Sequence, residues 1–336
     1  MNRSGIVCVG TAILDIVNII DTWPTEEQVA TIARTEYGAG GPPVNAAAGL
    51  VKLGAPFPVA LIGAVGDDAY GERVIESVRS LGVDPSGLRR IAGAVTSHTH
   101  VMSSAATGRR TFFHQTGVNA LLEESDLMPA NGNAKLFYGG SPGITRKLDA
   151  AQAWPRIFKT AQNLGMKTCL ELVPAPGNAI SELVPPCLPF IDYIVVNEHE
   201  AGEVTGLTLA AGRGLDWRAA KRACIKLLEM GVSTLAAVHH PDGAIAVMRD
   251  GVVAARGSVN VPQSEIAGSV GAGDAFYAGM LLGIHEGWPL GKCLELGNAA
   301  AATSLHSPTT SASIRPWAEC LAYATEKGTR PVPNFR

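Results

Sequence analysis

The residues best suited to chemistry lie together at 271–274, where the chain reads Gly-Ala-Gly-Asp and continues into the apolar stretch AFYAGMLLGI. Free backbone amides at a helix N-terminus attract negative charge, and glycines let an anion approach them closely. A carboxylate there would repel a merely bound anion, but it suits a base that takes a proton from an attacking hydroxyl. We therefore expect phosphoryl transfer, with Asp274 as the base and the amides of Gly271, Ala272 and Gly273 as the anion hole.

The same segment has a second interpretation. A glycine and an aspartate before an apolar run are also typical of a helix N-cap and its turn. Two familiar nucleotide loops are excluded by the residues themselves. A dinucleotide fingerprint would need a glycine where the chain has Phe276, and no stretch reads GxxxxGK[ST]. Neither a nicotinamide-type loop nor a P-loop is predicted.

Two other strand-to-helix turns carry polar side chains. In the segment GAGGPPVN, Gly40 and Gly41 would let the backbone approach a ligand while Asn45 points into the same space. Any tight strand-to-helix turn with a proline near the helix start has the same composition. Asn197 and Glu200 follow the apolar strand IDYIVV and could share a hydrated Mg²⁺ or form a helix cap. Both alternatives stay open for each turn.

Composition limits the class of protein. The chain has 336 residues, of which 46% are hydrophobic and 17% charged, so it can bury a full globular core. A formal charge of -3 provides no basic field for nucleic acid, and we expect a small-molecule partner instead. The apolar run IVCVG begins directly after MNRSG, and no apolar stretch reaches the roughly 20 residues of a membrane span. We therefore expect no signal peptide, no membrane contact and a cytoplasmic location.

Cysteines and histidines lack metal-binding spacing. The six cysteines are scattered without a CxxC pair, and the eight histidines contain no HExxH motif. Most cysteines stand among apolar residues, which is typical of reduced, buried thiols in the cytosol. No zinc site is predicted.

The order of elements predicts an α/β fold. Short apolar, β-branched runs alternate with longer segments of helical period, as in a doubly wound, mostly parallel sheet with helices on both faces. We expect strands at 5–10, 58–64, 134–139, 166–171, 191–196, 233–238 and 244–249. We expect helices at 43–53, 71–81, 149–164, 216–230, 274–287, 291–305 and 315–326.

Two segments interrupt this alternation. Residues 14–38 are strand-like without a helix, and residues 96–115 form an apparent hairpin around AATGRR. Together they could form a small sheet over the carboxyl edge of the main sheet. Such a lid suits reactions that exclude water, although an ordinary edge decoration would have the same pattern. We expect a single domain over 1–336 with these two segments as its lid.

Taken together and in this order, the motifs resemble the ribokinase-like, or PfkB, family of carbohydrate and nucleoside kinases. The resemblance covers essentially the whole chain, through VCVGTAILDIV, the Gly-Gly-x-x-x-Asn near residue 40, GAVGDDAYG, the Asn-x-x-Glu at 197–200 and GAGDAFYAGML. It implies a ribokinase-like fold and ATP-dependent transfer of the γ-phosphoryl group to a primary hydroxyl of a free sugar. An adenosine-type nucleoside kinase, a non-catalytic sugar-binding regulator and another donor such as ADP are the alternatives.

The resemblance also implies roles for particular residues on the acceptor side. Asp274 matches the catalytic base. Asp15, Gly40, Gly41 and Asn45 match positions that hold the hydroxyls of the acceptor, and a carboxylate such as Asp15 accepts two neighbouring hydroxyl protons well.

On the donor side, Asn197 and Glu200 match the pair that organises Mg²⁺ and the ATP phosphates, mostly through water. Gly243, in the turn VHHPDG, and Asn298, in the helix NAAAATSL, match the nucleotide-binding part of the chain. ATP and Mg²⁺ are therefore the expected cofactors.

Three departures from the family pattern qualify these expectations. Gly268-Ser269 stands where many members read Asp-Thr, so a monovalent cation site is doubtful. The turn 238–243 is one residue short of the usual Thr-x-Gly pattern, which puts the affinity or identity of the nucleotide in doubt. Pro42 replaces a lysine that ribokinases often carry, which argues against a plain ribokinase.

The lid segment gives further indications of the substrate and of the assembly. Phe112, Phe113 and His114 could close on a small ring, so His114 is an expected substrate-binding residue. Arg109 and Arg110 could read a phosphosugar, but a charge pair in a hairpin turn is more often solvated, and we expect a free sugar or the ribose of a nucleoside. A small sheet with exposed edges could also pair in a homodimer through the lid.

Overall fold

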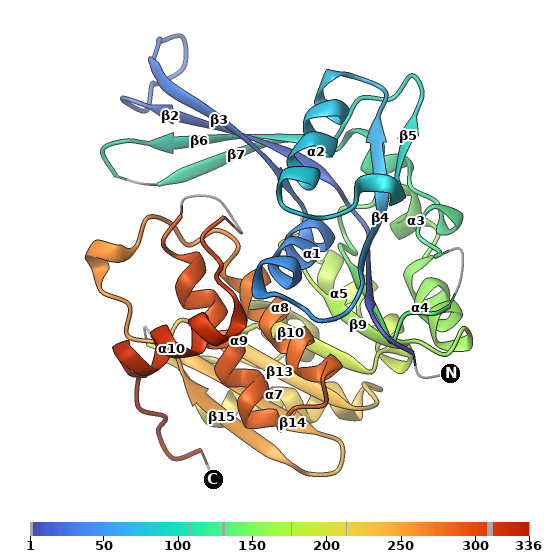
Figure 1. Cartoon of the computed structure of the whole chain (residues 1–336), viewed down its shortest axis with the longest axis vertical. Helices are drawn as coiled ribbons and strands as arrows, with labels where there is room; N and C mark the ends of the chain where they lie inside the picture. The colour runs from blue at the N-terminus through green and yellow to red at the C-terminus, as the bar shows by residue number, and fades with distance from the viewer. Residues whose placement is uncertain are drawn as a thin grey trace.

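A nine-stranded sheet forms the centre of the computed structural model, which describes residues 3–107, 109–129, 132–175, 177–212, 214–307 and 312–335 (Figure 1). In sheet order the strands are β15 (Val253–Gly257), β14 (Gly243–Met248), β13 (Leu235–His240), β10 (Tyr193–Asn197), β9 (Lys167–Glu171), β8 (Leu136–Gly140), β1 (Ile6–Val9), β4 (Val59–Gly66) and β5 (Leu88–Ile91). Only the β13–β14 and β14–β15 pairs are antiparallel among these described strands. The prediction of a mostly parallel sheet is confirmed.

Helices cover both faces of this sheet because its central strands are apolar on both sides. In β1, Ile6 and Cys8 belong to one core cluster, whereas Val7 and Val9 belong to the other. The helices are α1 (Pro42–Leu53), α2 (Ala69–Ser80), α3 (Arg146–Ala150), α4 (Trp154–Asn163), α5 (Ala179–Leu183), α6 (Glu198–Thr205), α7 (Trp217–Glu229), α8 (Ala272–His285), α9 (Leu290–Ser304) and α10 (Trp317–Lys327). Residues of α1, α8 and α9 fill the first cluster, and residues of α4 and α7 fill the second.

The expected helix at 149–164 is wrong as a single element. The structure divides this region into α3 and α4, and Gln152 between them has a positive φ of 46°. Pro155 stands in the first turn of α4, where its missing amide is tolerated, so the second helix begins there rather than continuing the first. The short strands β5 and β15 and the pair β11 (Ala210–Ala211) and β12 (Gly214–Leu215) were not expected.

A separate four-stranded sheet forms beside the main one, and we call it the lid sheet. Its strands lie in the order β3 (Ile32–Gly40), β2 (Ile13–Ile20), β6 (His98–Ser104) and β7 (Arg110–Gln115). The two predicted segments therefore do pair, through the parallel contact of β2 with β6. Gly108 of the β6–β7 turn lies outside the described residues. Figure 1 shows the lid sheet projecting from the body of the molecule beside α2.

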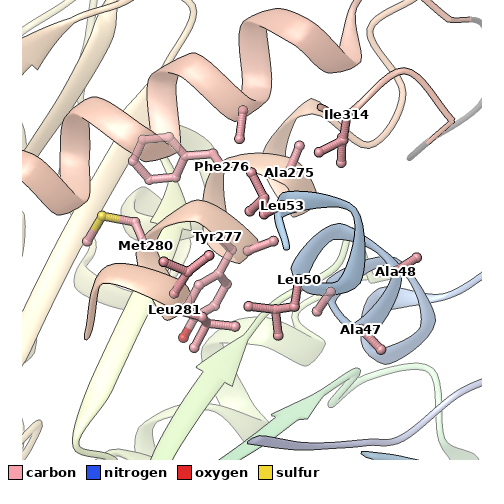
Figure 2. Packing of buried hydrophobic residues seen from close by; sticks show 14 of the residues in the cluster. Ala47, Ala48, Leu50, Leu53, Ala275, Phe276, Tyr277, Met280, Leu281 and Ile314 are labelled. Atoms are coloured by element: carbon pink, nitrogen blue, oxygen red, sulfur yellow. The ribbon is translucent and has the colours of Figure 1, made fainter. Parts of the chain in front are cut away.

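Helices α1 and α8 pack closely enough to exclude a side chain between them. A Cβ atom on Gly49 of α1 would lie 2.7 Å from the Cβ atom of Ala278 in α8, so glycine is required at this crossing. Around the contact lie buried apolar residues that include Leu50, Leu53 and Tyr277 (Figure 2). This packing fixes the starts of the two helices relative to each other.

Among the helices of the described residues, none combines the length and apolar character needed to cross a membrane.

Candidate active site

The first turn of α8 presents backbone amides and a carboxylate at one point. Gly271 precedes the helix with a φ of 79°, a left-handed conformation that glycine adopts without strain. Within the described part of the chain, no side chain caps this helix start. The amide of Ala272 makes a long contact of 3.3 Å with the carbonyl oxygen of Ser269. An anion could therefore bind to the amides of this turn beside Asp274.

Asp274 is held by a residue from the start of α1. The side-chain amide of Asn45 donates a hydrogen bond of 2.8 Å to Oδ2 of Asp274. Burial raises the pKa of Asp274, while hydrogen bonds from Glu171 and then Asn45 favour the charged form. Asn45 and Asp274 are 229 residues apart in sequence, and the α1–α8 packing brings them together.

Asp15 approaches the same point from the lid sheet. A Cβ atom on Gly40 would lie 2.3 Å from Oδ2 of Asp15, and one on Gly41 would lie 2.4 Å from the carbonyl oxygen of Thr11. A side chain at position 40 would displace the carboxylate of Asp15, and only glycine fits at position 41, where the contact is with backbone and φ is 100°. Burial, and then the negative charge of Asp274, raise the pKa of Asp15 to about 7. The structure therefore brings Asp15, Asn45 and Asp274 together. Asn45 is hydrogen-bonded to Asp274, and Asp15 is close enough for its charge to interact with that of Asp274.

His114 lies on the same face of the lid sheet as Asp15. Thr99 of β6 is the cross-strand partner both of Asp15 in β2 and of His114 in β7, and such partners share a face. The hydroxyl of Thr99 and Nδ1 of His114 are 3.0 Å apart. Burial, followed by the charge of His98, lowers the pKa of His114. A neutral imidazole therefore faces the side from which Asp15 reaches the site.

Asn197 and Glu200 form the helix cap that was one of their two interpretations. Oδ1 of Asn197 accepts hydrogen bonds from the amides of His199 and Glu200, at 3.0 and 2.9 Å, and Oε2 of Glu200 accepts one of 3.0 Å from the amide of Asn197. Burial raises the pKa of Glu200 to about 7, with the amide of Asn197 opposing this effect and the charge of Asp274 adding to it. The cap thus places a buried carboxyl group close enough to Asp274 for their charges to interact.

This pair also fits a hydrated Mg²⁺. No group of three or more metal-binding side chains occurs in the described ranges, so the protein offers few direct oxygen ligands. Mg²⁺ keeps several waters and needs only one or two carboxylates beside the phosphates of a substrate. Glu200, with only one oxygen engaged in the cap, could serve in this way.

A cavity of about 500 Å³ extends from these helix starts to α9. Its lining includes Asn197, Gly273, His239 and Asn298, and its volume suits a small organic ligand. The side-chain amide of Asn298 donates to the carbonyl oxygens of Arg256 and Gly257 at 3.3 and 3.2 Å, so this residue holds β15 while lining the cavity.

Gly243, an expected nucleotide contact, lies in the turn beside this cavity. It is not among the residues that line the cavity, where His239, His240 and Pro241 represent its turn. A Cβ atom on Gly243 would lie 2.3 Å from the carbonyl oxygen of Arg256. Close packing of β14 against β15 therefore accounts for this glycine.

A model of the "pfkB family carbohydrate kinase" matches residues 3–317 of the chain. The chain belongs to the pfkB family. It is therefore an ATP-dependent sugar kinase.

Individual relatives of this pfkB-family kinase include different substrate classes. It is 27% identical over 286 residues to a probable chloroplastic fructokinase-6 of Arabidopsis thaliana, covering 82% of this chain and 69% of that one. It is 25% identical to an adenosine kinase of Saccharomyces cerevisiae, covering 83% and 81% of the two chains. The structure of Arabidopsis thaliana ribokinase complexed with ribose and ATP superimposes with a TM-score of 0.79 at 22% identity, covering 96% of this chain and 99% of that one. The last comparison establishes the ribokinase-like fold.

Glu171 is a buried carboxyl group of this pfkB-family kinase that the sequence interpretation did not single out. It ends β9 and contacts Asp274. Burial raises its pKa well above the usual range, and the charge of Asp274 raises it further. Its Oε2 is buried without a hydrogen-bond partner in the described structure. A carboxylate at the end of the apolar strand KTCLE was the available signal.

His239 was also missed as a site residue. Its ring lies 5.1 Å from that of Phe276, and a Cβ atom on Gly273 would lie 3.2 Å from Cε1 of His239. Burial, and then the charge of His240, lower the pKa of His239 to about 4. A neutral imidazole therefore supports the turn that begins α8.

Proposed function

We propose that this kinase transfers the γ-phosphoryl group of ATP to a primary hydroxyl of a free sugar, with Asp274 as the general base. The convergence of Asp274, Asn45 and Asp15 at the first turns of α1 and α8 carries this proposal. A buried carboxylate beside free helix amides supplies both a proton acceptor and a site for the charge of a phosphoryl group.

The acceptor sugar lies between the lid sheet and the start of α1 in this mechanism. Asp15 accepts hydrogen bonds from two neighbouring hydroxyls, and Asn45 orients both the sugar and the side chain of Asp274. Gly40 and Gly41 leave room for a close approach to the backbone. His114 lies on the lid face that would cover the ring, and closure of that face would exclude water.

Asp274 then takes the proton of the attacking hydroxyl. The hydroxyl oxygen forms a bond with the γ-phosphorus while the bond between that phosphorus and the β–γ bridging oxygen breaks, and ADP leaves with the bonding electrons. The amides of Gly271, Ala272 and Gly273 stabilise the charge on the transferred group. Asn45 keeps the carboxylate in place during the transfer through its bond to Oδ2.

The donor nucleotide occupies the cavity that extends to α9 in this proposal. Asn298 lines its far end, and the capped pair Asn197 and Glu200 lies near the phosphates. Mg²⁺, when bound there mostly through water, would neutralise charge on the phosphates. The departures at Gly268 and in the turn 238–243 leave potassium activation unexpected and the donor open to test.

A nucleoside is the second candidate acceptor, and the similarity to an adenosine kinase supports it. Arg109 is exposed in the turn before β7, which favours an unphosphorylated acceptor over a phosphosugar. A regulator without turnover is disfavoured because four carboxyl groups with raised pKa values gather at one point, and such perturbed groups are typical of catalytic sites.

We also propose that the whole chain is one domain and that it dimerises through the lid sheet. Phe112 and Phe113 expose 56% and 55% of their surface on β7, the edge strand of that sheet. Sedimentation of the wild-type protein and a Phe112→Ser, Phe113→Ser variant tests the dimer. A monomeric wild type would contradict it.

The test of the function is ADP release with ATP and Mg²⁺ across free sugars, phosphosugars and nucleosides, with Asp274→Asn measured in parallel. Turnover on free sugars that disappears in the variant would support the proposal. Turnover only on nucleosides would transfer the assignment to the second candidate. Turnover with ADP but not ATP would change the donor, and ligand-induced thermal shifts without any turnover would favour the regulator.

A further inference from the structure

The C-terminal segment returns to the rim of the nucleotide cavity after α10. Val259 and Thr329 form an antiparallel bridge, and the amide of Arg330 donates a hydrogen bond of 2.8 Å to the carbonyl oxygen of Ser258. The amide of Asn260 donates to the carbonyl oxygen of Gly328 at 3.0 Å. The pfkB family model ends at residue 317, so this strand-like segment lies beyond the matched part of the chain.

This backbone pairing places the side chain of Arg330 on the lining of the cavity. Its Nη1 lies 3.0 Å from Oδ1 of Asp242, in the turn between β13 and β14. Oδ2 of Asp242 in turn accepts a hydrogen bond of 3.0 Å from the amide of Leu215. The guanidinium is therefore oriented by a carboxylate that is itself held in place, and half of the arginine side chain remains exposed.

Arg330 is the only lysine or arginine among the described residues that line the cavity. Glu198 contributes negative charge to the same lining, and His239 is neutral because burial lowers its pKa to about 4. A nucleoside triphosphate carries several negative charges, and among the described lining residues only Arg330 has a side chain that stays positively charged at every physiological pH. The planar guanidinium binds phosphate oxygens with paired hydrogen bonds.

We propose that Arg330 binds the phosphate chain of the nucleotide, which makes the C-terminal segment part of the donor site. This inference rests on the proposed function, since it takes the cavity to be the ATP site. It also supplies a positive charge beside the turn 238–243, which lacks the usual Thr-x-Gly pattern.

Calorimetric titration of the full chain with ATP, ADP, AMP and adenosine tests the proposal. We expect Arg330→Met to weaken ATP and ADP binding about tenfold and to leave adenosine binding unchanged, as loss of a charged hydrogen bond predicts. Arg330→Lys should recover part of the loss because it keeps the charge. Arg222→Met removes an exposed arginine of α7 that is not part of the cavity lining and should bind all four ligands like the wild type.

Asp242→Asn distinguishes a direct phosphate contact by Arg330 from a purely structural role of the Arg330–Asp242 ion pair. It removes the same ion pair but leaves Arg330 on the rim through its backbone bonds, so ATP binding should stay within about threefold of the wild type. An equal loss for ATP and adenosine in Arg330→Met, no loss at all, or an Asp242→Asn variant as weak as Arg330→Met would each overturn the inference. A wild type that binds neither ATP nor ADP would overturn the proposed function itself.

Discussion

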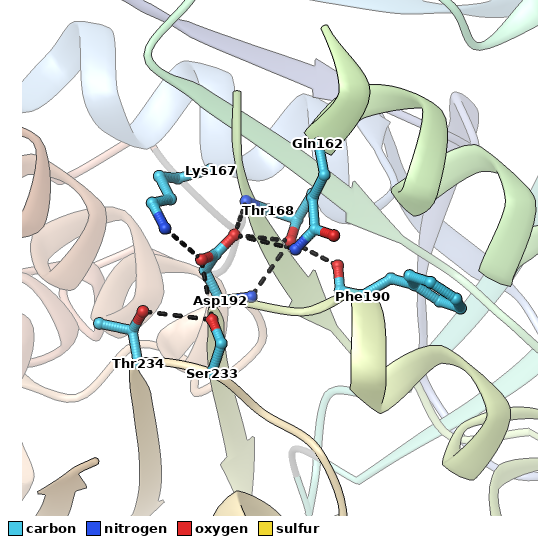
Figure 3. A network of polar contacts seen from close by, with 7 residues as sticks. All are labelled: Gln162, Lys167, Thr168, Phe190, Asp192, Ser233 and Thr234. Carbon is cyan, nitrogen blue, oxygen red and sulfur yellow. Dashed lines mark hydrogen bonds and ion pairs between the residues drawn. The ribbon is translucent and has the colours of Figure 1, made fainter. Parts of the chain in front are cut away.

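Buried carboxyl groups lie at both ends of strands β9 and β10, and the surroundings at the two ends differ. Asp192 stands just before β10, is 2% exposed, and belongs to the network drawn in Figure 3. It accepts hydrogen bonds of 2.7 Å from Nζ of Lys167, 3.0 Å from the amide of Thr168 and 2.8 Å from the hydroxyl of Ser233. Burial alone would raise its pKa, but these donors outweigh it and hold the pKa below the usual value.

The carboxyl ends of these strands show the reverse balance. Glu171 ends β9, and Glu200 follows β10; both have raised pKa values, as do Asp15 and Asp274. For these four groups burial is the largest effect, and no lysine or arginine of the described structure counts among the causes that offset it. Asp192 therefore stabilises the fold. The four carboxyl groups at the other end are unfavourable when they are ionised, and a substrate, a proton or a cation would offset this cost.

The largest expected effect is on turnover at the carboxyl edge. Asp274→Asn removes the proposed proton acceptor and keeps a side chain of nearly the same shape, so kcat should fall at least roughly 10²-fold while ATP affinity is largely retained. Steady-state kinetics and nucleotide titration on the same preparation measure both. Near-normal turnover would show that another group accepts the proton.

The matching change at the amino edge should affect stability instead. Asp192→Ala leaves the amide of Thr168 and the hydroxyl of Ser233 without their acceptor, and we expect the free energy of unfolding to fall by about 2–3 kcal/mol. Urea unfolding measures this loss, and kcat of the folded fraction should be unchanged. A stable variant with low kcat would contradict the division between the two edges.

The free energy of unfolding should depend on pH because of Asp15. Its folded pKa of about 7 lies above the ordinary value of 3.8, so between these values the folded state binds more protons than the unfolded state. The contribution of Asp15 to stability is therefore present below about pH 4 and is lost as the pH rises through about 7.

Asp15→Asn removes this loss because the amide does not titrate. We expect it to unfold with a free energy about 2 kcal/mol higher than the wild type at pH 8, and nearly equal to it at pH 4, while its acceptor binding weakens. Urea unfolding at the two pH values gives the comparison. A difference that does not depend on pH would show that the pKa of Asp15 is not raised in the folded protein.

The smallest expected effect concerns Glu171, which favours the charged form of Asp274 through a hydrogen bond. Glu171→Leu removes that bond, so the acidic limb of the kcat profile should move to higher pH and kcat should fall about tenfold at neutral pH. Glu171→Gln keeps a donor and should keep both properties close to the wild type. Identical profiles for the two variants would mean that Glu171 only fills space.

Much of this arrangement could be predicted because the relevant signals are local. Alternating apolar strands and helices specify the parallel sheet, and glycine-rich turns mark where α1 and α8 begin. Asn45 and Asp274 stand beside those turns, and the resemblance to one family was enough to group Asp15 with them. The strands β5 and β15 escaped because each is short and lies at an edge of the sheet.

The missed site residues depend on tertiary neighbours. Glu171 acquires its significance from the sheet order, which sets the end of β9 between β8 and β10 and close to Asp274. Arg330 reaches the cavity only because its backbone pairs with Ser258, and no periodicity in the tail indicates that pairing. The break before Pro155 is different, since the proline itself was a readable signal.

The contact between Gly49 and Ala278 has a consequence for how such an enzyme can diversify. Asn45 and Asp274 lie in the first turns of two helices that meet without an intervening side chain, so the distance between the proposed base and its amide partner leaves little room for substitution. Side chains on β6 and β7 of the lid sheet, by contrast, lie on strands that can exchange residues without moving that helix pair. If the proposed function holds, substitutions on the lid could change the acceptor while Asn45 and Asp274 keep their positions.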